Sequence, residues 1–214
     1  MLTYRLITDT YYLVGYSPDA DSVKFKADNP HLWQILETDH YERFVEKFER
    51  DDGIITLRLQ GVDGIETHYS PPGVRPPKDL QKKVKASKLP PPHRGNHRQP
   101  EAAGQAATDV LLGRLGVHDP SWRKWGKRTW IDKALIARGS NRVMVTEKYE
   151  DAVPGYIITA DIEKNGRPLS WIFPGKAPLP DGSILSSAQV AEMAIESVNY
   201  TLVEQGMVYP YFYK

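Results

Sequence analysis

The sequence pattern of a complete β-hairpin occurs in the stretch Gly155-Tyr-Ile-Ile-Thr-Ala-Asp-Ile-Glu-Lys-Asn-Gly-Arg-Pro-Leu-Ser-Trp-Ile-Phe173. Two runs rich in β-branched and aromatic residues flank the dipeptide Asn165-Gly166. Asn-Gly between such runs is the strongest short-range signal for a tight turn joining antiparallel strands. The stretch therefore predicts a β-hairpin.

Further strands and helices are predicted on the N-terminal side of this hairpin. Four more strands are expected at residues 11–15, 22–25, 54–59 and 142–146, and the first two flank a polar turn at residues 17–21. One or two short helices are expected within residues 31–50. Another helix is expected to begin at Pro100 and to end at Gly116, because proline fits the first turn and glycine the C-cap.

A last helix is predicted from Ser186 to Gln205, where Ser186 and Gln189 form a capping box. Five or so short strands, with one helix in the middle and another near the end, favour a mixed α+β fold. The expected architecture is a small barrel with helices packed on it. We expect one domain over residues 1–214.

Composition excludes several classes of site. The chain has 214 residues and no cysteine, so disulfides, thiolate zinc sites, iron–sulfur clusters and cysteine nucleophiles are excluded. The longest apolar runs are far shorter than the ~20 residues needed to span a bilayer, and no membrane association is expected. The net charge of +1 gives no overall nucleic-acid signature.

The charge is nevertheless uneven. Residues 70–100 carry eight bases and one acid, and they hold eight of the 17 prolines. Proline-rich runs favour extended polyproline II and supply few amide donors, so a long loop is expected here. The loop is either a solvated linker or a basic arm that attracts a polyanion.

Three segments carry polar residues that a barrel could bring together. They supply Asp19 and Asp21 from a turn, Arg58, Asp63 and Glu66 from a strand end and the following turn, and Arg167 after Asn165-Gly166. Two aspartates and a turn carbonyl suit Ca²⁺, which prefers oxygen ligands. Two arginines suit a phosphate, and a glutamate can orient or deprotonate a water.

The order and local sequence of these segments resemble the staphylococcal nuclease-like (thermonuclease) family. The matching blocks are Asp19-Ala-Asp-Ser-Val23, Leu57-Arg-Leu-Gln-Gly-Val-Asp-Gly-Ile-Glu-Thr67, Gln99-Pro-Glu-Ala-Ala103, Asn165-Gly-Arg-Pro-Leu-Ser-Trp-Ile-Phe173 and Leu202-Val-Glu-Gln-Gly-Met207. These blocks cover about half of the chain. Insertions are expected at residues 27–52, 70–98 and 118–141.

The resemblance implies an OB-fold five-stranded barrel with calcium-dependent phosphodiesterase activity on DNA and RNA. Asp21, Asp63 and the carbonyl of Gly64 correspond to calcium ligands, with Asp19 as a second acid near the metal. Glu66 corresponds to the residue that activates the attacking water, and Arg58 and Arg167 to the phosphate clamps. Tyr211, Tyr209 and Tyr213 correspond to aromatic residues that line the nucleotide pocket.

The chain departs from the family pattern at three places. Gly64 stands where the family has threonine, and Ile65 stands where it has proline. The assignment of Arg167 depends on aligning Asn165-Gly-Arg with the family's second arginine. The segment at residues 153–155 could also precede that strand, in which case the second arginine is missing.

Three tryptophans and four bases alternate in Ser121-Trp-Arg-Lys-Trp-Gly-Lys-Arg-Thr-Trp130. This pattern suits single-stranded nucleic acid, because bases stack on aromatic faces while cations hold the phosphates. In the other interpretation, the tryptophans attach the insertion to the barrel.

The sequence therefore favours a calcium-dependent nuclease that acts on DNA or RNA, preferably single-stranded, with a monomer assumed. The second hypothesis is a barrel with weak or lost catalysis that binds nucleic acid or protein. Sugar hydrolysis by paired carboxylates would leave the two arginines unexplained. If Met1 is the natural start, no secretory signal is present and a cytoplasmic location is expected, although family members are often secreted.

Overall fold

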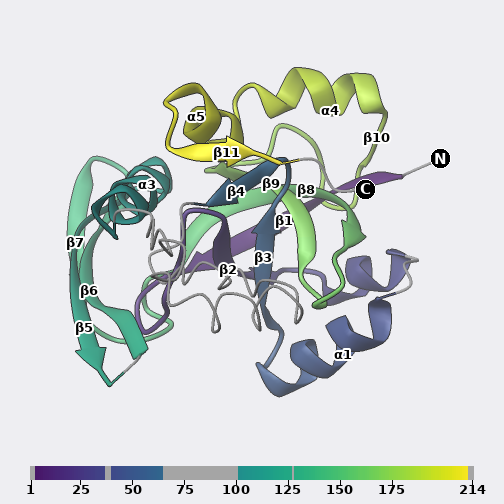
Figure 1. Cartoon of the computed structure of the whole chain (residues 1–214). Helices are drawn as coiled ribbons and strands as arrows, with labels where there is room; N and C mark the ends of the chain where they lie inside the picture. Colours follow the sequence, from purple (N-terminus) through teal and green to yellow (C-terminus); the bar gives the residue numbers. More distant parts are fainter. Residues whose placement is uncertain (1–2, 37–39, 65–100, 127, 212–214) are drawn as a thin grey trace, which may run out of the picture.

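The computed structural model describes residues 3–36, 40–64, 101–126 and 128–211, and its centre is a closed barrel of five strands (Figure 1). The strands are β1 (Tyr4–Tyr12), β2 (Ser22–Ala27), β3 (Ile54–Leu59), β8 (Val153–Ile162) and β9 (Pro168–Pro174). β1, β2 and β3 form an antiparallel meander, and β8 and β9 form the expected hairpin. β9 runs parallel to β3, and β8 pairs with β1 to close the ring. The prediction of a mixed α+β fold built on an OB-fold-like barrel is confirmed.

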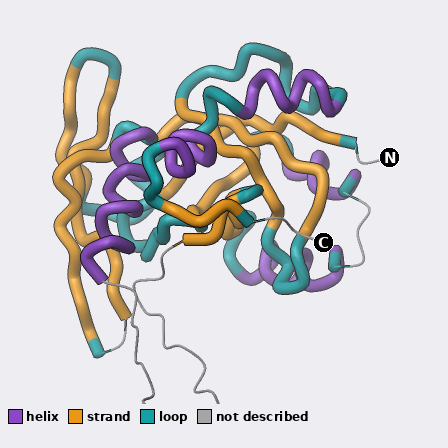
Figure 2. Tube along the Cα trace, turned by 45° about the horizontal axis from the view of Figure 1, so that its top comes forward, coloured by secondary structure: helices purple, strands orange, loops and turns teal. Residues whose placement is uncertain are grey.

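Three smaller groups of strands surround the barrel. β10 (Ile184–Leu185) pairs with β1, and β4 (Val62–Gly64) pairs with β11 (Val208–Pro210). β5 (Val117–Trp125), β6 (Arg128–Arg138) and β7 (Asn141–Val145) form a separate three-stranded sheet. Figure 2 shows this sheet at one side of the barrel, beside the helix that precedes it.

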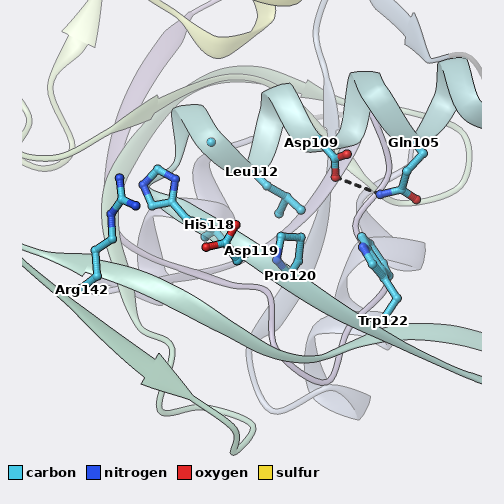
Figure 3. Close-up of a pocket in the computed structure, with 10 residues that line it drawn as sticks. Gln105, Asp109, Leu112, His118, Asp119, Pro120, Trp122 and Arg142 are labelled. Carbon is cyan, nitrogen blue, oxygen red and sulfur yellow. Dashed lines mark hydrogen bonds between the residues drawn. The ribbon is translucent and has the colours of Figure 1, made fainter.

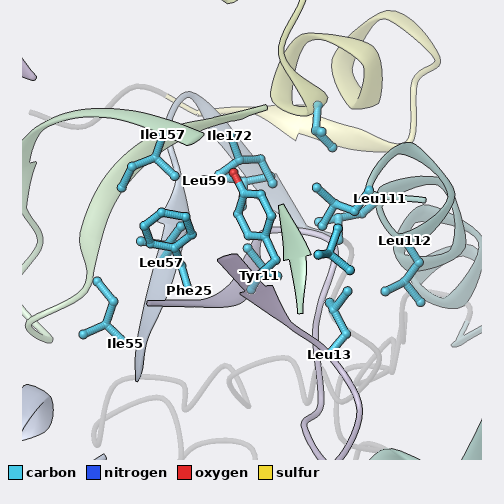
Figure 4. Close-up of a cluster of buried hydrophobic side chains, with 14 of the residues drawn as sticks. Tyr11, Leu13, Phe25, Ile55, Leu57, Leu59, Leu111, Leu112, Ile157 and Ile172 are labelled. Carbon is cyan, nitrogen blue, oxygen red and sulfur yellow. The ribbon is translucent and has the colours of Figure 1, made fainter. Parts of the chain in front are cut away.

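Four α-helices and one 3₁₀ helix lie in the part of the chain that the structure describes. They are η1 (Pro30–Ile35), α1 (Tyr41–Arg50), α3 (Glu101–Arg114), α4 (Ser187–Ala194) and α5 (Val198–Glu204). Leu111 and Leu112 of α3 pack into the main core with side chains from the barrel strands (Figure 4). A second core lies between the barrel and α4 and contains Phe173 and Val190. None of the described helices is long and apolar enough to cross a membrane.

Three predictions about elements are corrected by the structure. The first strand is Tyr4–Tyr12 and not residues 11–15, because it pairs with β2, β8 and β10 over its earlier residues. The last helix is split in two: the side chain of Ser197 accepts a hydrogen bond from the Tyr200 N–H and caps a new helix. The insertion predicted at residues 118–141 forms most of the three-stranded sheet. The insertion predicted at residues 70–98 lies outside the described residues.

A buried tyrosine fills the barrel where β1, β8 and β9 meet. The Tyr11 hydroxyl donates to the Tyr156 carbonyl at 2.7 Å and accepts from the Phe173 N–H at 3.2 Å. The ring lies directly against Gly155, where a Cβ would come within 2.2 Å of a Tyr11 ring carbon and 2.5 Å of the Phe173 carbonyl oxygen. Gly155 is therefore required for this close approach of chain and ring.

A buried carboxylate holds the connection between β1 and β2. Asp151 is fully buried, and its Oδ2 accepts from the N–H groups of Leu13 and Val14, the latter at 2.7 Å. Burial raises the pKa of Asp151 above its ordinary value, although the two N–H groups and Arg138 act in the opposite direction. Asp151 thus connects the turn just before β8 to the segment that leads into the turn at residues 17–21.

Gly155→Ala should destabilise the protein by about 1–3 kcal/mol, because the added methyl group overlaps the Tyr11 ring and a backbone carbonyl. Gly113→Ala is the matched control: its Cβ would meet nothing within 4 Å and lies in a helix, where alanine is favoured by up to about 1 kcal/mol. Urea unfolding of both variants measures the difference. Equal stabilities would contradict the packing of Tyr11 on Gly155.

Asp151→Asn should change how stability depends on pH. Because the folded state binds the Asp151 proton more tightly than the unfolded chain does, the wild type loses stability as the pH rises from the ordinary pKa of 3.8 through the raised pKa of the folded state. The loss approaches about 1.4 kcal/mol per pH unit within that window. The asparagine variant has no such proton and should lack this fall in a series of urea titrations. Parallel pH profiles would contradict the assignment.

Candidate functional site

Two residues of the expected site meet where β2 and β3 pair. Asp21 directly precedes β2, and the register of the two strands sets Ser22 opposite Arg58. The main-chain carbonyl of Asp21 accepts from the Leu59 N–H at 2.8 Å, which fixes the aspartate beside the end of β3. From there the Asp21 carboxylate forms an ion pair with the Nη1 of Arg58.

A second carboxylate reaches the same guanidinium from the turn after β3. Gly61, with φ +77°, reverses the chain into β4 and so returns Asp63 toward Arg58. Arg58 Nη2 lies 2.5 Å from Asp63 Oδ1. The side chains of Asp21 and Arg58 are only 4% and 12% exposed, whereas that of Asp63 is 48% exposed. One buried arginine therefore holds one buried and one accessible carboxylate.

Gly64 completes this arrangement through its backbone. Its N–H donates to Asp21 Oδ2 at 2.8 Å. A Cβ at this position would lie 3.0 Å from that same oxygen and 3.2 Å from the Cβ of Ala20. Glycine at this position thus accompanies a close approach of β4 to the Asp21 side chain.

The carboxylates of the site repel one another. Burial is the largest influence and raises the pKa of Asp21 above its ordinary value, and the charges of Asp19 and Asp63 raise it further. Arg58 and the Gly64 N–H lower that pKa but do not cancel the increase. A cation beside these acids would therefore be favoured electrostatically.

Asp19 occupies a tight turn beside the site. Its main chain exchanges two hydrogen bonds with Ser22, at 3.0 and 3.1 Å, and its Oδ1 accepts from the Ala20 N–H at 2.7 Å. This turn brings Asp19 within electrostatic range of Asp21. Asp19, the expected second acid of the site, therefore lies near Asp21.

Arg167 stands at the start of the strand that pairs with β3. The parallel register sets Arg58 opposite Leu169, two residues after Arg167, whereas residues 153–155 begin β8, which pairs with β1. The Arg167 guanidinium forms an ion pair with Glu163 at 2.7 Å. Among the described ion pairs, Arg167 thus pairs with an acid of the β8–β9 turn, whereas Arg58 pairs with the two aspartates.

Two of the three expected tyrosines border the site. Tyr209 lies opposite Asp63 in the β4–β11 pair, and the Tyr211 N–H donates to the Gly61 carbonyl at 2.9 Å. Both side chains are exposed. Glu66 and Tyr213 lie outside the described residues.

The residues present supply part of an oxygen ligand set for a hard cation. Asp21 and Asp63 provide two carboxylates that both contact the Arg58 guanidinium, and the main-chain carbonyl of Gly64 belongs to the same strand as Asp63. No group of three histidine, aspartate or glutamate side chains with metal-binding geometry occurs among residues 3–36, 40–64, 101–126 and 128–211. Calcium often binds carbonyl and water oxygens in addition to carboxylates. The carboxylates of Asp21 and Asp63 could therefore form part of a calcium site.

An aromatic and cationic cluster near the site was not expected from the sequence. Lys148 Nζ lies 4.3 Å from the ring centre of Tyr16 and 4.8 Å from that of Tyr149, and Lys24 Nζ lies 5.5 Å from Tyr16. Lys24 is two residues from Ser22 on the same face of β2. The tyrosines in residues 11–16 were a sequence signal for an aromatic cluster. The contribution of Lys148 and Tyr149 could not be predicted, because they come from a distant turn.

A groove of about 490 Å³ lies away from these residues, between α3 and the inserted sheet (Figure 3). Its polar lining includes Asp109, which accepts from Gln105 Nε2 at 2.9 Å, and His118, Asp119 and Arg142. Among the described residues, none of the expected metal-binding, phosphate-binding or pocket-lining tyrosine residues lines it, whereas Trp122 of the Trp-rich segment does.

Comparisons of the chain with protein-family models, with curated proteins and with solved structures give no match. Functional inference therefore depends on the geometry above and on the sequence resemblance.

Arg58→Met should destabilise the protein by about 3–5 kcal/mol in the presence of EGTA, because the buried carboxylate of Asp21 loses its counter-charge. Asp63→Asn is the matched control, since it removes a half-exposed partner of the same arginine and should cost at most about 1 kcal/mol. Urea unfolding at neutral pH gives both values. If both variants lost a similar free energy of unfolding, the buried ion pair of Arg58 with Asp21 would not be the stronger of the two.

Proposed function

We propose that this protein is a metal-dependent phosphodiesterase that cleaves DNA or RNA at the cluster of Asp21, Arg58 and Asp63. The observation that supports this proposal is the convergence of two carboxylates, from separate strands, on one largely buried guanidinium. Carboxylates for a divalent cation and an arginine for a phosphate are the groups that phosphodiester cleavage requires.

Ca²⁺ is the proposed cation, with Asp21, Asp63 and the Gly64 carbonyl as its protein ligands. A bound Ca²⁺ would polarise a phosphate oxygen and so make the phosphorus more electrophilic. Burial is the main cause of the raised pKa of Asp21, and the charges of Asp19 and Asp63 add to it. A bound cation would offset the repulsion between these acids. Asp19 would add negative charge without direct coordination.

Arg58 and Arg167 are the proposed phosphate contacts. Each presents a planar set of N–H donors, and such donors stabilise the charge that develops on phosphate oxygens as the bond to the leaving group breaks. Arg58 is held in place by its aspartates and Arg167 by Glu163, so both side chains are oriented before any phosphate arrives. We assign the activation of water to Glu66 on the sequence resemblance alone.

A second candidate function is nucleic-acid or protein binding without efficient cleavage. Two observations favour it: both arginines are ion-paired with acids of this chain, and the described residues do not form a three-carboxylate metal set. In this case the barrel and its tyrosines would bind a strand that the site does not cut.

Single-stranded DNA cleavage with calcium or with EGTA tests the proposal. Wild type should cut only with calcium, and Glu66→Gln should slow cleavage by about 10²–10⁴-fold, as expected on removal of a general base. Glu204→Gln is the matched control, because this acid lies at the end of α5 and should be dispensable. Calcium-dependent cleavage that persists in Glu66→Gln would remove Glu66 from the chemistry.

Calorimetric titration with calcium separates the metal site from the chemistry. Glu66→Gln should bind calcium much as the wild type does, whereas Asp21→Asn combined with Asp63→Asn should lose the binding. If the wild type binds a strand but neither calcium nor cleavage is detected, the binding module becomes the better description.

A further inference from the structure

The three tryptophans of the β5–β6 hairpin do not lie on one face. Trp122 lies opposite the fully buried Ile131 and packs against the main core. Trp125, three residues later, is 81% exposed. Trp122 therefore attaches the insertion to the barrel, as one interpretation of the Trp-rich segment expected, whereas Trp125 does not.

The strand register assembles a mixed face from the remaining residues. Arg123 lies opposite Trp130, and Trp125 lies opposite Arg128. Since residues two apart on a strand share a face, these four side chains form two adjacent rungs on the side away from Trp122 and Ile131. We call this set, Arg123, Trp125, Arg128 and Trp130, the Trp–Arg face.

The Trp–Arg face alternates aromatic rings and guanidinium groups along both strands. Same-face residues on a strand are about 6.8 Å apart, and each rung pairs one aromatic ring with one guanidinium. A ring can stack on an unpaired base while the neighbouring guanidinium contacts the adjoining phosphate. In a duplex the base faces are already stacked, so this combination fits a single strand.

The charge around the Trp–Arg face also favours a polyanion. Residues 117–146 contain seven arginines and lysines and two aspartates. One of those aspartates, Asp132, pairs with Arg123 through two contacts, at 3.1 and 3.2 Å, which orient that guanidinium and also offset part of its charge. The phosphate contact is therefore tested at Arg128. The hairpin lies at the edge of the molecule, where a strand could approach it (Figure 1).

The hairpin is joined directly to the loop that carries the candidate acids. The Gly15 N–H donates to the Ile131 carbonyl at 2.7 Å, and the Ile131 N–H donates to the Tyr16 carbonyl at 2.9 Å. Asp19 and Asp21 follow Tyr16 in the same connection between β1 and β2. The position of the Trp–Arg face is thus fixed relative to the candidate site by backbone hydrogen bonds.

From these observations we propose that the Trp–Arg face is a binding surface for single-stranded nucleic acid, separate from the cluster of Asp21, Arg58 and Asp63. It would hold a strand by stacking on Trp125 and Trp130 and by phosphate contacts from Arg123 and Arg128. The proposal goes beyond the proposed function and does not require catalysis, because binding can be measured in EGTA.

Fluorescence anisotropy with a labelled short oligothymidylate in EGTA tests the proposal. Trp125→Ala should weaken binding by about 5- to 100-fold, which is the usual effect of removing one stacking partner. Trp125→Tyr should retain most of the affinity, and an abasic strand of equal length should not distinguish Trp125→Ala from wild type. Arg128→Gln should reduce the slope of log affinity against log salt by about 0.7, the value expected for one phosphate contact.

Two matched variants control for general effects on the protein. Lys124→Gln removes a positive charge one residue from Trp125 but on the opposite face, so it should change the salt slope less than Arg128→Gln does. Tyr200→Ala removes an exposed aromatic side chain on α5 and should bind the strand as wild type does.

Three outcomes would overturn the proposal. The first is wild-type affinity in Trp125→Ala, and the second is an equal loss with base-bearing and abasic strands. The third is a Trp125→Ala variant that binds the strand as wild type does but no longer binds phosphatidylserine vesicles. That result would assign the hairpin to an anionic membrane surface. A failure of calcium-dependent cleavage leaves all of these measurements unaffected.

Discussion

Closure of the barrel between β3 and β9 is the constraint on which the rest of the structure depends. The two strands pair in parallel at Arg58 and Leu59, and the buried side chain of Asn199 reinforces the seam from α5. Its Nδ2 donates to the carbonyls of Gln60 and Ser170 at 2.9 and 3.0 Å, and its Oδ1 accepts from the Ile172 N–H at 3.0 Å. One amide thus joins the C-terminal helix, β9 and the turn that leads to Asp63.

The candidate site takes its shape from this seam. Arg58 lies on the paired part of β3, Asp63 follows the turn that Asn199 holds, and Asp21 is fixed to Leu59 through its carbonyl. The barrel therefore sets the backbone positions of the site residues, and the Arg58 guanidinium forms ion pairs with both carboxylates. Such a site is pre-organised, because its described residues lie on strands or on short turns held by backbone hydrogen bonds.

Local patterns predicted the elements that local forces determine. The Asn165-Gly166 hairpin, the capping box at Ser186 and the helix at residues 101–114 follow from turn and cap chemistry. The early start of β1 depends on β8, a partner far along the chain, which periodicity does not report. The hairpin of β5 and β6 is local, but it lies in a segment expected only as an insertion. In the site, the resemblance indicated Asp21, Arg58, Asp63 and Gly64, which the fold brings together. It did not indicate that Glu163 would pair with Arg167, because that contact depends on the β8–β9 turn.

The pairing of β1 with β8 has a consequence for synthesis of the chain. Arg5 lies opposite Thr159, so the first strand cannot complete its ladder until the ribosome has released residues more than 150 positions later. At about 5–20 residues per second, Leu6 and Ile7 would wait for many seconds with their apolar side chains in water. Closure of the barrel through β1 and β8 is therefore a late event in synthesis, and the burial of Leu6 and Ile7 depends on it.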